Sequence, residues 1–242
     1  MREFDVLVWG LDESETHEPP FKDRALEFHF TNSFNRALKN IDAEWVVLAH
    51  KSINIDREFL NSLAIATGEY PMVDAFSPRI RTKDGNFVSG FTLDSRLMLK
   101  MIPENSAMRF VASPHPYIVA FSSRIIQRTG AFDTCIQHTA QIADYSLRML
   151  HAGGVMFSLP YLVASTIDEN ANVPGDNIYS GAERELLYAK VKSFGIFENI
   201  PYIALHPCSA MFCIRHRKEL LEKRNKAILL SKLEKNFLQK IR

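Results

Sequence analysis

The sequence predicts an α/β fold, with a mixed, mostly parallel β-sheet flanked by helices. Short apolar runs alternate along the chain with segments of helical period, which is the pattern of strands joined by helices. Residues 45–49 (WVVLA) are wholly apolar, as expected of a strand buried on both faces. The 242 residues are 46% hydrophobic and 24% charged, so the chain is long enough and apolar enough for one large domain or for a domain with an appendage.

Two further strands and two helices are predicted in the first quarter of the chain. Apolar runs at residues 5–9 and 26–30 favour strands. Residues 32–41 and 56–67 repeat apolar side chains at helical spacing. Asp56 stands where an N-cap is expected, because its carboxylate can accept a hydrogen bond from the first turn.

The rest of the sheet is predicted from four apolar runs, at residues 72–77, 87–93, 117–121 and 155–163. A later helix is predicted at residues 180–194, opening with a serine and a glutamate at capping-box spacing.

Residues 121–154 carry the most informative pattern. They predict a strand end, a short helix, a Gly-Ala-Phe-Asp turn at residues 130–133 and a second helix that ends at Gly153-Gly154.

This pattern resembles the acceptor-side segment of the inverting family-2-type glycosyltransferases, which have the GT-A fold. In that family a Gly-Gly-Phe-Asp-Glu turn leads into a Glu-Asp-x-Asp-Leu-x-x-Arg helix that ends at an Ala-Gly pair. Here residues 130–134 read GAFDT, and the spacing from the turn to Arg148 matches without a gap. The resemblance implies acceptor-side positions for Asp133, Gln141, Ile142 and Arg148.

The catalytic positions depart from the family pattern. Ile142 stands where the family has its general base, and an isoleucine cannot take a proton from an acceptor hydroxyl. If that register holds, Ile142 faces the acceptor cleft. Asp144 is a candidate base, but it lies roughly 200° around the helix from Ile142, and its spacing to Arg148 also suits a structural ion pair. His115 is a second candidate base.

The resemblance extends to the donor side. Residues 32–38 (NSFNRAL) precede the strand at 44–48 (EWVVL), in the order of the family's asparagine-containing helix and the strand that ends in Asp-x-Asp. This match implies donor-binding roles for Asn32 and Arg36.

The Asp-x-Asp motif itself is replaced by Ala49, His50 and Lys51. The family's carboxylates hold a divalent cation that bridges the donor diphosphate. Lys51 cannot hold a cation but can itself place positive charge beside a diphosphate, so we expect no metal or other cofactor, with manganese or magnesium doubtful. His50 and Lys51 are therefore donor-side candidates, unless they are simply exposed at a strand end.

The C-terminal segment differs from the rest. Residues 215–242 hold ten lysines or arginines and three glutamates, in a chain whose net charge is only +1. Four apolar side chains in this segment form one helical stripe: Leu230, Leu233, Phe237 and Ile241. The segment is predicted to be a basic amphipathic helix, which suits either peripheral contact with an anionic membrane or packing on the domain.

Two functions follow from the resemblance. The first is a glycosyltransferase that moves a sugar from a nucleotide-sugar donor to a glycan or lipid-linked acceptor, with inversion and metal independence as the expected mechanism. The second is a catalytically inactive relative that binds sugar, nucleotide or a protein partner. The expected organisation is a GT-A-like domain over residues 1–214, followed by the basic helix.

Composition also indicates which partners and which cellular location to expect. Basic residues cluster only in the C-terminal segment, so a nucleic-acid partner is not expected. The three cysteines are too few and too scattered for a disulfide framework, and no apolar run reaches the length of a membrane span. These features favour a cytoplasmic location, with membrane contact limited to the inner face.

Overall fold

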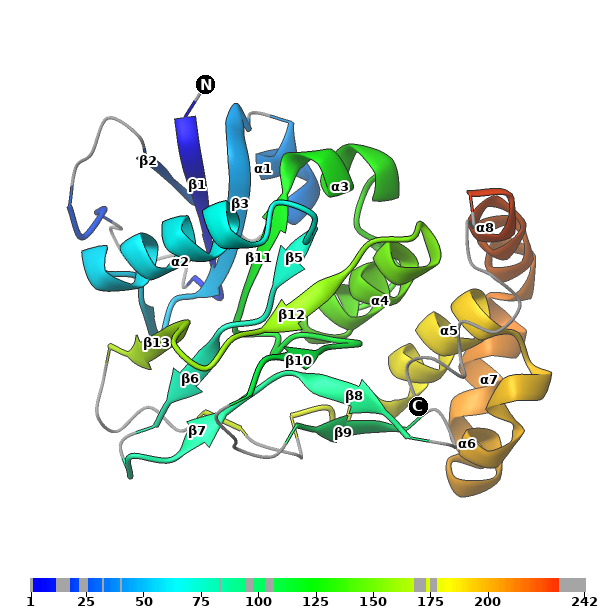
Figure 1. Cartoon of the computed structure of the whole chain (residues 1–242). Helices are drawn as coiled ribbons and strands as arrows, with labels where there is room; N and C mark the ends of the chain where they lie inside the picture. Colours follow the sequence, from blue (N-terminus) through cyan, green and yellow to red (C-terminus); the bar gives the residue numbers. More distant parts are fainter. Residues whose placement is uncertain are drawn as a thin grey trace.

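A computed structural model describes residues 2–11, 18–21, 26–31, 33–39, 41–82, 84–94, 98–102, 107–167, 173–174 and 178–230. Its centre is a seven-stranded sheet in the order β2-β1-β3-β11-β5-β12-β10 (Figure 1). The strands are β1 (Arg2–Trp9), β2 (Leu26–Phe30), β3 (Ala43–His50), β5 (Ala75–Phe76), β10 (Arg109–Phe110), β11 (Ile118–Ser122) and β12 (Met156–Ser158). 

The predicted mixed, mostly parallel sheet is confirmed. β1 is parallel to both β2 and β3, and β12 is parallel to β5. β11 is antiparallel to β3 and β5, and β10 is antiparallel to β12, so only these two strands run against the other five.

The two faces of the sheet bury different helices. In β3, Trp45 and Val47 face α2 (Arg57–Glu69), whereas Val46 and Leu48 face α1 (Phe34–Leu38) and α4 (His138–His151). This alternation is the period of two that every strand imposes. The predicted cap of α2 is confirmed, because the Asp56 carboxylate accepts a hydrogen bond of 2.8 Å from the Phe59 amide.

A smaller sheet lies beyond the carboxyl ends of β3, β5 and β12, and a hairpin lies beside it (Figure 1). The sheet comprises β4 (Ile53–Asn54), β6 (Arg79–Arg81), β7 (Phe87–Val88) and β13 (Val163–Thr166), and the hairpin comprises β8 (Phe91–Leu93) and β9 (Leu99–Met101).

Two predicted strands are each split in two by this arrangement. The run at 87–93 breaks at Gly90, where a Cβ would clash with the Val111 side chain and the Ser113 carbonyl. The run at 155–163 breaks in a turn that contains Pro160, which cannot donate a ladder hydrogen bond.

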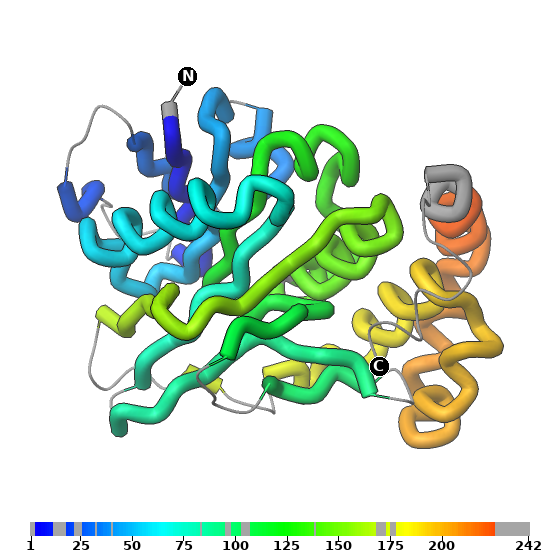
Figure 2. Tube along the Cα trace, in the orientation of Figure 1, coloured from blue at the N-terminus to red at the C-terminus, as the bar shows by residue number. Residues whose placement is uncertain are grey.

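The C-terminal part of the chain forms a group of helices beside the sheet (Figure 2). Its members are α5 (Glu183–Phe194), η1 (Phe197–Asn199), α6 (Ile200–Leu205), α7 (Pro207–Arg215) and α8 (Arg217–Leu230). Leu220 of α8 packs with Leu187 and Tyr188 of α5, so α8 is docked on this group. The apolar stripe predicted at residues 230–241 lies outside the described side chains. Among the described helices, none is long and apolar enough to cross a membrane.

Ile142 corrects the predicted orientation of α4. Its side chain is fully buried in the cluster that joins α4 to β1 and β3, with Leu7 and Leu48 in the same cluster. The hypothesis that Ile142 faces an acceptor cleft is therefore wrong. The packing reason is that α4 is amphipathic, and its apolar stripe, which includes Ile142 and Tyr145, covers the sheet.

We therefore expect Ile142→Asp to destabilise the protein by more than about 4 kcal/mol, because it removes apolar burial and leaves a charge unpaired in the core. Urea unfolding would measure the change. Ile65→Asp is the matched control, since Ile65 is 56% exposed on α2. Similar free energies of unfolding for the two variants would contradict the core assignment.

Lys190 is an unusual member of the α5 core. Its side chain is buried, and Nζ lies 3.8 Å from the centre of the Tyr202 ring, with no hydrogen-bond partner in the described part of the chain. Burial lowers the pKa of Lys190 to about 7, although Asp94 opposes the shift. The folded protein therefore holds this lysine with a smaller proton affinity than the unfolded chain does.

Lys190→Met should stabilise the protein most below pH 7, where the native lysine is charged in both states and burial penalises the folded one. Between pH 7 and about 10 only the unfolded chain keeps the proton, so the advantage of methionine should shrink. Thermal unfolding at several pH values measures this, with the exposed Lys218→Met as control. A difference that does not change with pH would refute the lowered pKa.

Candidate functional site

The strand order has a switch point at the carboxyl ends of β1 and β3, and we call this edge of the sheet the crevice. β1 has β2 on one side and β3 on the other, so the direction of strand addition reverses there. Ligands of open α/β sheets bind outside the carboxyl ends of the strands at such a switch point. Trp9 ends β1 and Gly10 follows it, whereas His50 ends β3 and Lys51 follows it, so all four residues lie at this edge.

Aromatic rings hold the crevice residues in place. The His50 ring stacks on Tyr117 with a centroid distance of 4.3 Å and meets the edge of Trp9 at 4.7 Å. Gly10 has a φ of +79°, and a Cβ there would collide with the His50 imidazole. Glycine is therefore required at this position both by backbone conformation and by close approach. The Lys51 amide donates to the Trp9 carbonyl at 2.8 Å, which ties the two strand ends together.

His50 is a neutral hydrogen-bonding group in this setting. Burial, helped by the neighbouring Lys51, lowers the pKa of His50 to about 4. The Ser52 amide donates to Nδ1 at 3.3 Å, so the ring proton sits on Nε2. The positive charge in the crevice then comes from Lys51, which is half-buried.

The other predicted donor-side residues are less well placed. Arg36 is exposed on α1, because Phe34 and Ala37 occupy the face that packs on the sheet. Asn32 lies outside the described residues. The structure therefore brings His50 and Lys51 together with Trp9 and Gly10, which the sequence did not single out.

His115 is fully buried behind the crevice. Its Nε2 donates to the Pro174 carbonyl at 2.9 Å, and its Nδ1 accepts from the Tyr117 amide at 3.2 Å. Burial is the main cause that lowers the pKa of His115 to about 4. Both ring nitrogens are used in holding the chain, so in this arrangement neither faces an acceptor.

The predicted acceptor-side residues meet in a buried ionic cluster. Asp144 and Arg148 form the predicted ion pair at 2.9 Å, and the Asp144 side chain is fully buried. Lys192 of α5 approaches Asp144 at 2.5 Å and Asp133 at 2.7 Å. Gln141 donates to the Asp133 carbonyl at 2.9 Å. Asp144 is thus held by two cations and is not open to a substrate.

Lys223 of α8 completes the cluster. Its ammonium lies 2.7 Å from Asp133 and 2.5 Å from Glu219. Burial alone would raise the pKa of Asp133, but Lys192 and Lys223 override it and hold the pKa well below its usual range. The carboxylate is therefore charged at every pH near neutrality.

Sequence reasoning missed three residues that organise this region: Lys192, Lys223 and Asn35. The Asn35 side chain clamps the turn, donating to the Phe132 carbonyl at 2.9 Å and accepting from the Phe132 amide at 2.7 Å. All three lie far from the turn in sequence. The one available signal was that two predicted acids, Asp133 and Asp144, needed cationic partners if they were buried.

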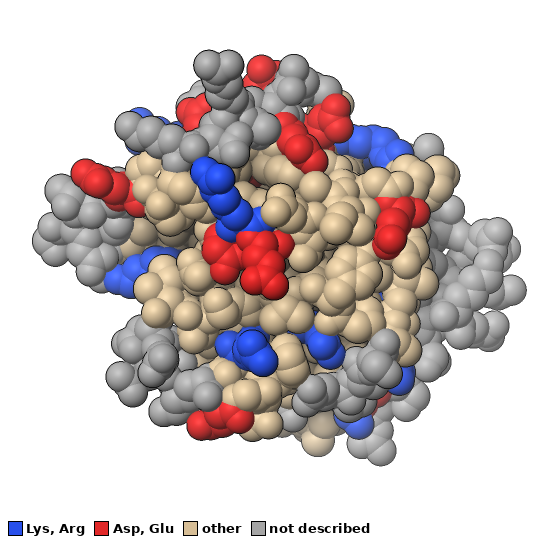
Figure 3. Space-filling view, turned by 60° about the vertical axis from the view of Figure 1, so that its left-hand side comes forward, with Lys and Arg blue, Asp and Glu red and all other residues tan. Residues whose placement is uncertain are grey.

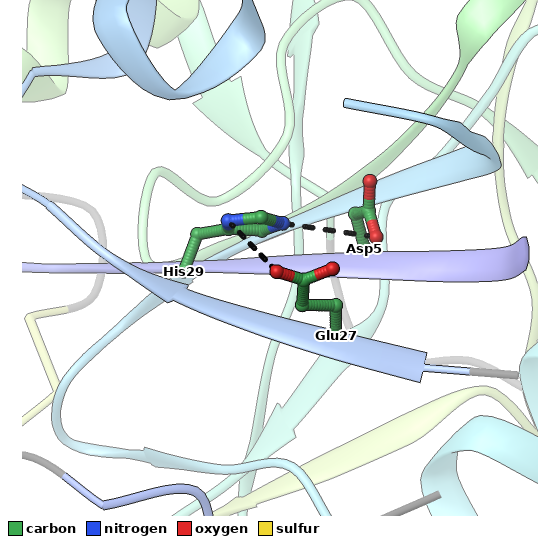
Figure 4. Close-up of side chains that lie close together, drawn as sticks. All are labelled: Asp5, Glu27 and His29. Carbon is green, nitrogen blue, oxygen red and sulfur yellow. Dashed lines mark ion pairs between the residues drawn. The ribbon is translucent and has the colours of Figure 1, made fainter. Parts of the chain in front are cut away.

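Among the residues that the structure describes, two groups of side chains have donor atoms close enough to share a metal. In the first, Asp5, Glu27 and His29 lie on one face of β1 and β2, with Asp5 Oδ1 3.7 Å from His29 Nε2 (Figure 4). The second is Asp133, Cys135 and Glu219, which already surrounds the Lys223 ammonium. Neither group includes His50 or Lys51 at the crevice.

Lys192→Met should cost about 3–5 kcal/mol in the free energy of unfolding at pH 7, because it leaves Asp133 and Asp144 buried with one cation fewer. Denaturant unfolding gives the value. Lys218→Met, which removes an exposed charge, should change it by less than about 0.5 kcal/mol. Equal effects of the two substitutions would mean that the buried pairs add nothing to stability.

Comparison by sequence finds no matching family model and no matching curated protein. Comparison by structure finds the crystal structure of GalNAc-T7 with UDP, GalNAc and Mn²⁺, with a TM-score of 0.64 at 11% identity, covering 99% of this chain. The chain spans 56% of the length of that structure.

Two further solved structures align with lower scores. The mannosyltransferase PcManGT from Pyrobaculum calidifontis, with GDP-Man and Mn²⁺, gives a TM-score of 0.48 at 11% identity, over 95% of this chain and 86% of that one. S. aureus TarS 1–349 gives 0.46 at 13% identity, over 93% and 81%. The likeness to GalNAc-T7, together with the strand order and the mixed sheet, establishes that this chain has the GT-A glycosyltransferase fold.

Proposed function

We propose that this protein is a glycosyltransferase that binds a nucleotide-sugar donor in the crevice between β1 and β3. The observation that carries the proposal is the switch point itself, where Gly10 and Lys51 directly follow the neighbouring strands β1 and β3 at the carboxyl edge of a GT-A sheet. Gly10 has no side chain, so the His50 ring can lie against its backbone at this edge.

In this proposal, side chains of the protein, and not a metal ion, balance the negative charge of the donor diphosphate. Lys51 supplies positive charge, and the Nε2–H of neutral His50 supplies a hydrogen-bond donor. Ala49, where the family has an acid, is buried in the α2 face and offers no ligand. We therefore propose metal-independent transfer by inversion, to a glycan or lipid-linked acceptor.

The state of the acceptor side favours a second candidate, a GT-A domain that binds a nucleotide sugar without transferring it. Ile142 is core, Asp144 is held by Lys192 and Arg148, and both nitrogens of His115 are engaged. A general base must reach the acceptor hydroxyl, and none of these three residues is open to one in this arrangement.

Contact with a membrane is a further part of the proposal, and rests on the basic residues of 215–242. On the face seen in Figure 3, by contrast, acidic and basic side chains of the described residues are interspersed. Among the described residues on that face, neither sign of charge dominates. The proposal of peripheral contact therefore rests on the composition of residues 215–242 alone.

Nucleotide binding tests the proposal. UDP, GDP and their sugar conjugates should bind with unchanged affinity in the presence of Mn²⁺ or of EDTA, measured by calorimetry. Lys51→Ala should weaken binding of the diphosphate about tenfold, because it removes the crevice cation. Lys39→Ala, at an exposed position beyond α1, is the matched control and should bind as the native protein does.

Loss of binding on chelation would refute the metal-independent form of the proposal, and equal binding by the two lysine variants would refute the crevice. If binding is found, release of free sugar or transfer to added acceptors separates the two candidates. Turnover supports the enzyme, and tight binding without turnover supports the binding domain.

A further inference from the structure

A second concave site lies away from the crevice. A cavity of about 560 Å³ opens between the turn after α3 (Ser123–Thr129), the last turns of α4, and α5 and α8. Its volume falls within the range of small-molecule sites, about 300–1,000 Å³. None of Trp9, Gly10, His50 or Lys51 lines it, so it is separate from the proposed donor site.

The charged lining of this cavity is unbalanced. Arg128, Arg148, Lys192 and Lys223 contribute four cations, against the carboxylates of Asp133 and Glu219. Lys192 and Lys223 are held by these acids and by Asp144. With Asp144 counted, four cations meet three acids, so the cavity keeps an excess of one positive charge at neutral pH, which favours an anion.

The arginines differ in how far their donors are used. Arg148 donates to Asp144 and to the carbonyls of Thr129 and Ala131, so it is fixed in the cavity wall. Arg128 is exposed, and in the described part of the chain its guanidinium has one hydrogen-bond partner, the Ala152 carbonyl. Most of its five N–H donors remain at the mouth of the cavity, in the fork that suits phosphate or carboxylate.

The uncharged lining adds an apolar wall beside these cations. Ala131, Phe132 and Ala152 line the cavity together with His151, whose Nε2 is itself buried. Burial is the main cause that lowers the pKa of His151 to about 4, so this ring is neutral. Apolar walls with a few polar or charged groups are typical of small-molecule sites.

We propose that this cavity binds a sugar-sized molecule that carries a phosphate or a carboxylate, with the anion at Arg128 and the rest of the molecule against the wall formed by Ala131, Phe132 and Ala152. Such a site would let an anionic sugar derivative bind next to the turn and α4 without entering the donor crevice. The proposal does not depend on whether the protein transfers sugar.

Calorimetric titration of the full chain with glucose 6-phosphate, D-glucuronate and D-glucose tests the site. At least one of the anionic sugars should bind about tenfold more tightly than glucose, and its affinity should fall with salt. Arg128→Ala should lose about tenfold in affinity for that sugar. Lys218→Ala removes an exposed charge from α8 outside the cavity and should bind within about twofold of the native protein.

The same titrations show whether the sugar binds in the cavity or in the crevice, and whether the site prefers a phosphate or a carboxylate. Lys51→Ala should leave binding of the anionic sugar intact, because Lys51 does not line the cavity. A tighter affinity for glucose 6-phosphate or for D-glucuronate shows which anionic group the cavity prefers. Several results would overturn the proposal: no binding of any of the three sugars, equal binding of charged and neutral sugars, equal losses in Arg128→Ala and Lys218→Ala, or loss of binding in Lys51→Ala. Because Arg128 is exposed, its replacement should not disturb folding, which thermal unfolding checks.

Discussion

The Lys192 ammonium, bridging Asp133 and Asp144, is the interaction on which the arrangement of this protein most depends. It joins three separate elements: the turn after α3, the middle of α4, and α5. Since its three charged groups are almost wholly buried, none can lose its partner without a large penalty. Lys223 extends the same cluster to α8, so the C-terminal helices are attached to the sheet domain by charge as well as by apolar packing.

This cluster has a consequence for chemistry. The helix that carries catalytic acids in the resembling family is used here for structure, with Ile142 in the core and Asp144 neutralised. The donor site that we propose lies instead at the carboxyl edge of the sheet, where the neutral His50 ring lies against Gly10 and Lys51 follows β3. The proposal rests on this edge because Asp144 and His115, the two candidate bases, are engaged in contacts within the chain.

Local signals predicted much of the fold. Each long apolar run became a strand, the Asp56 cap formed as expected, and the spacing of residues 121–154 correctly placed α3, the turn and α4. Tertiary contacts split some predicted strands that the sequence pattern did not divide. At Gly90, for example, Val111 and the Ser113 carbonyl leave no room for a side chain. The sequence correctly placed His50 and Lys51 at the end of a strand, because the end of an apolar run can be recognised locally.

The sequence by itself determined the alternation of strands and helices and the absence of acids at positions 49 and 51. The strand order, with its switch at β1, came only from the structure. Tertiary structure alone decided which face of α4 is buried. The sequence pattern does not fix how a helix is rotated about its axis, and this rotation is set only when the helix packs on the sheet. It also decided that Lys192 and Lys223, distant in sequence, neutralise Asp133 and Asp144. Partners across such separations leave no local pattern, since the pairing follows from how helices pack and not from spacing along the chain.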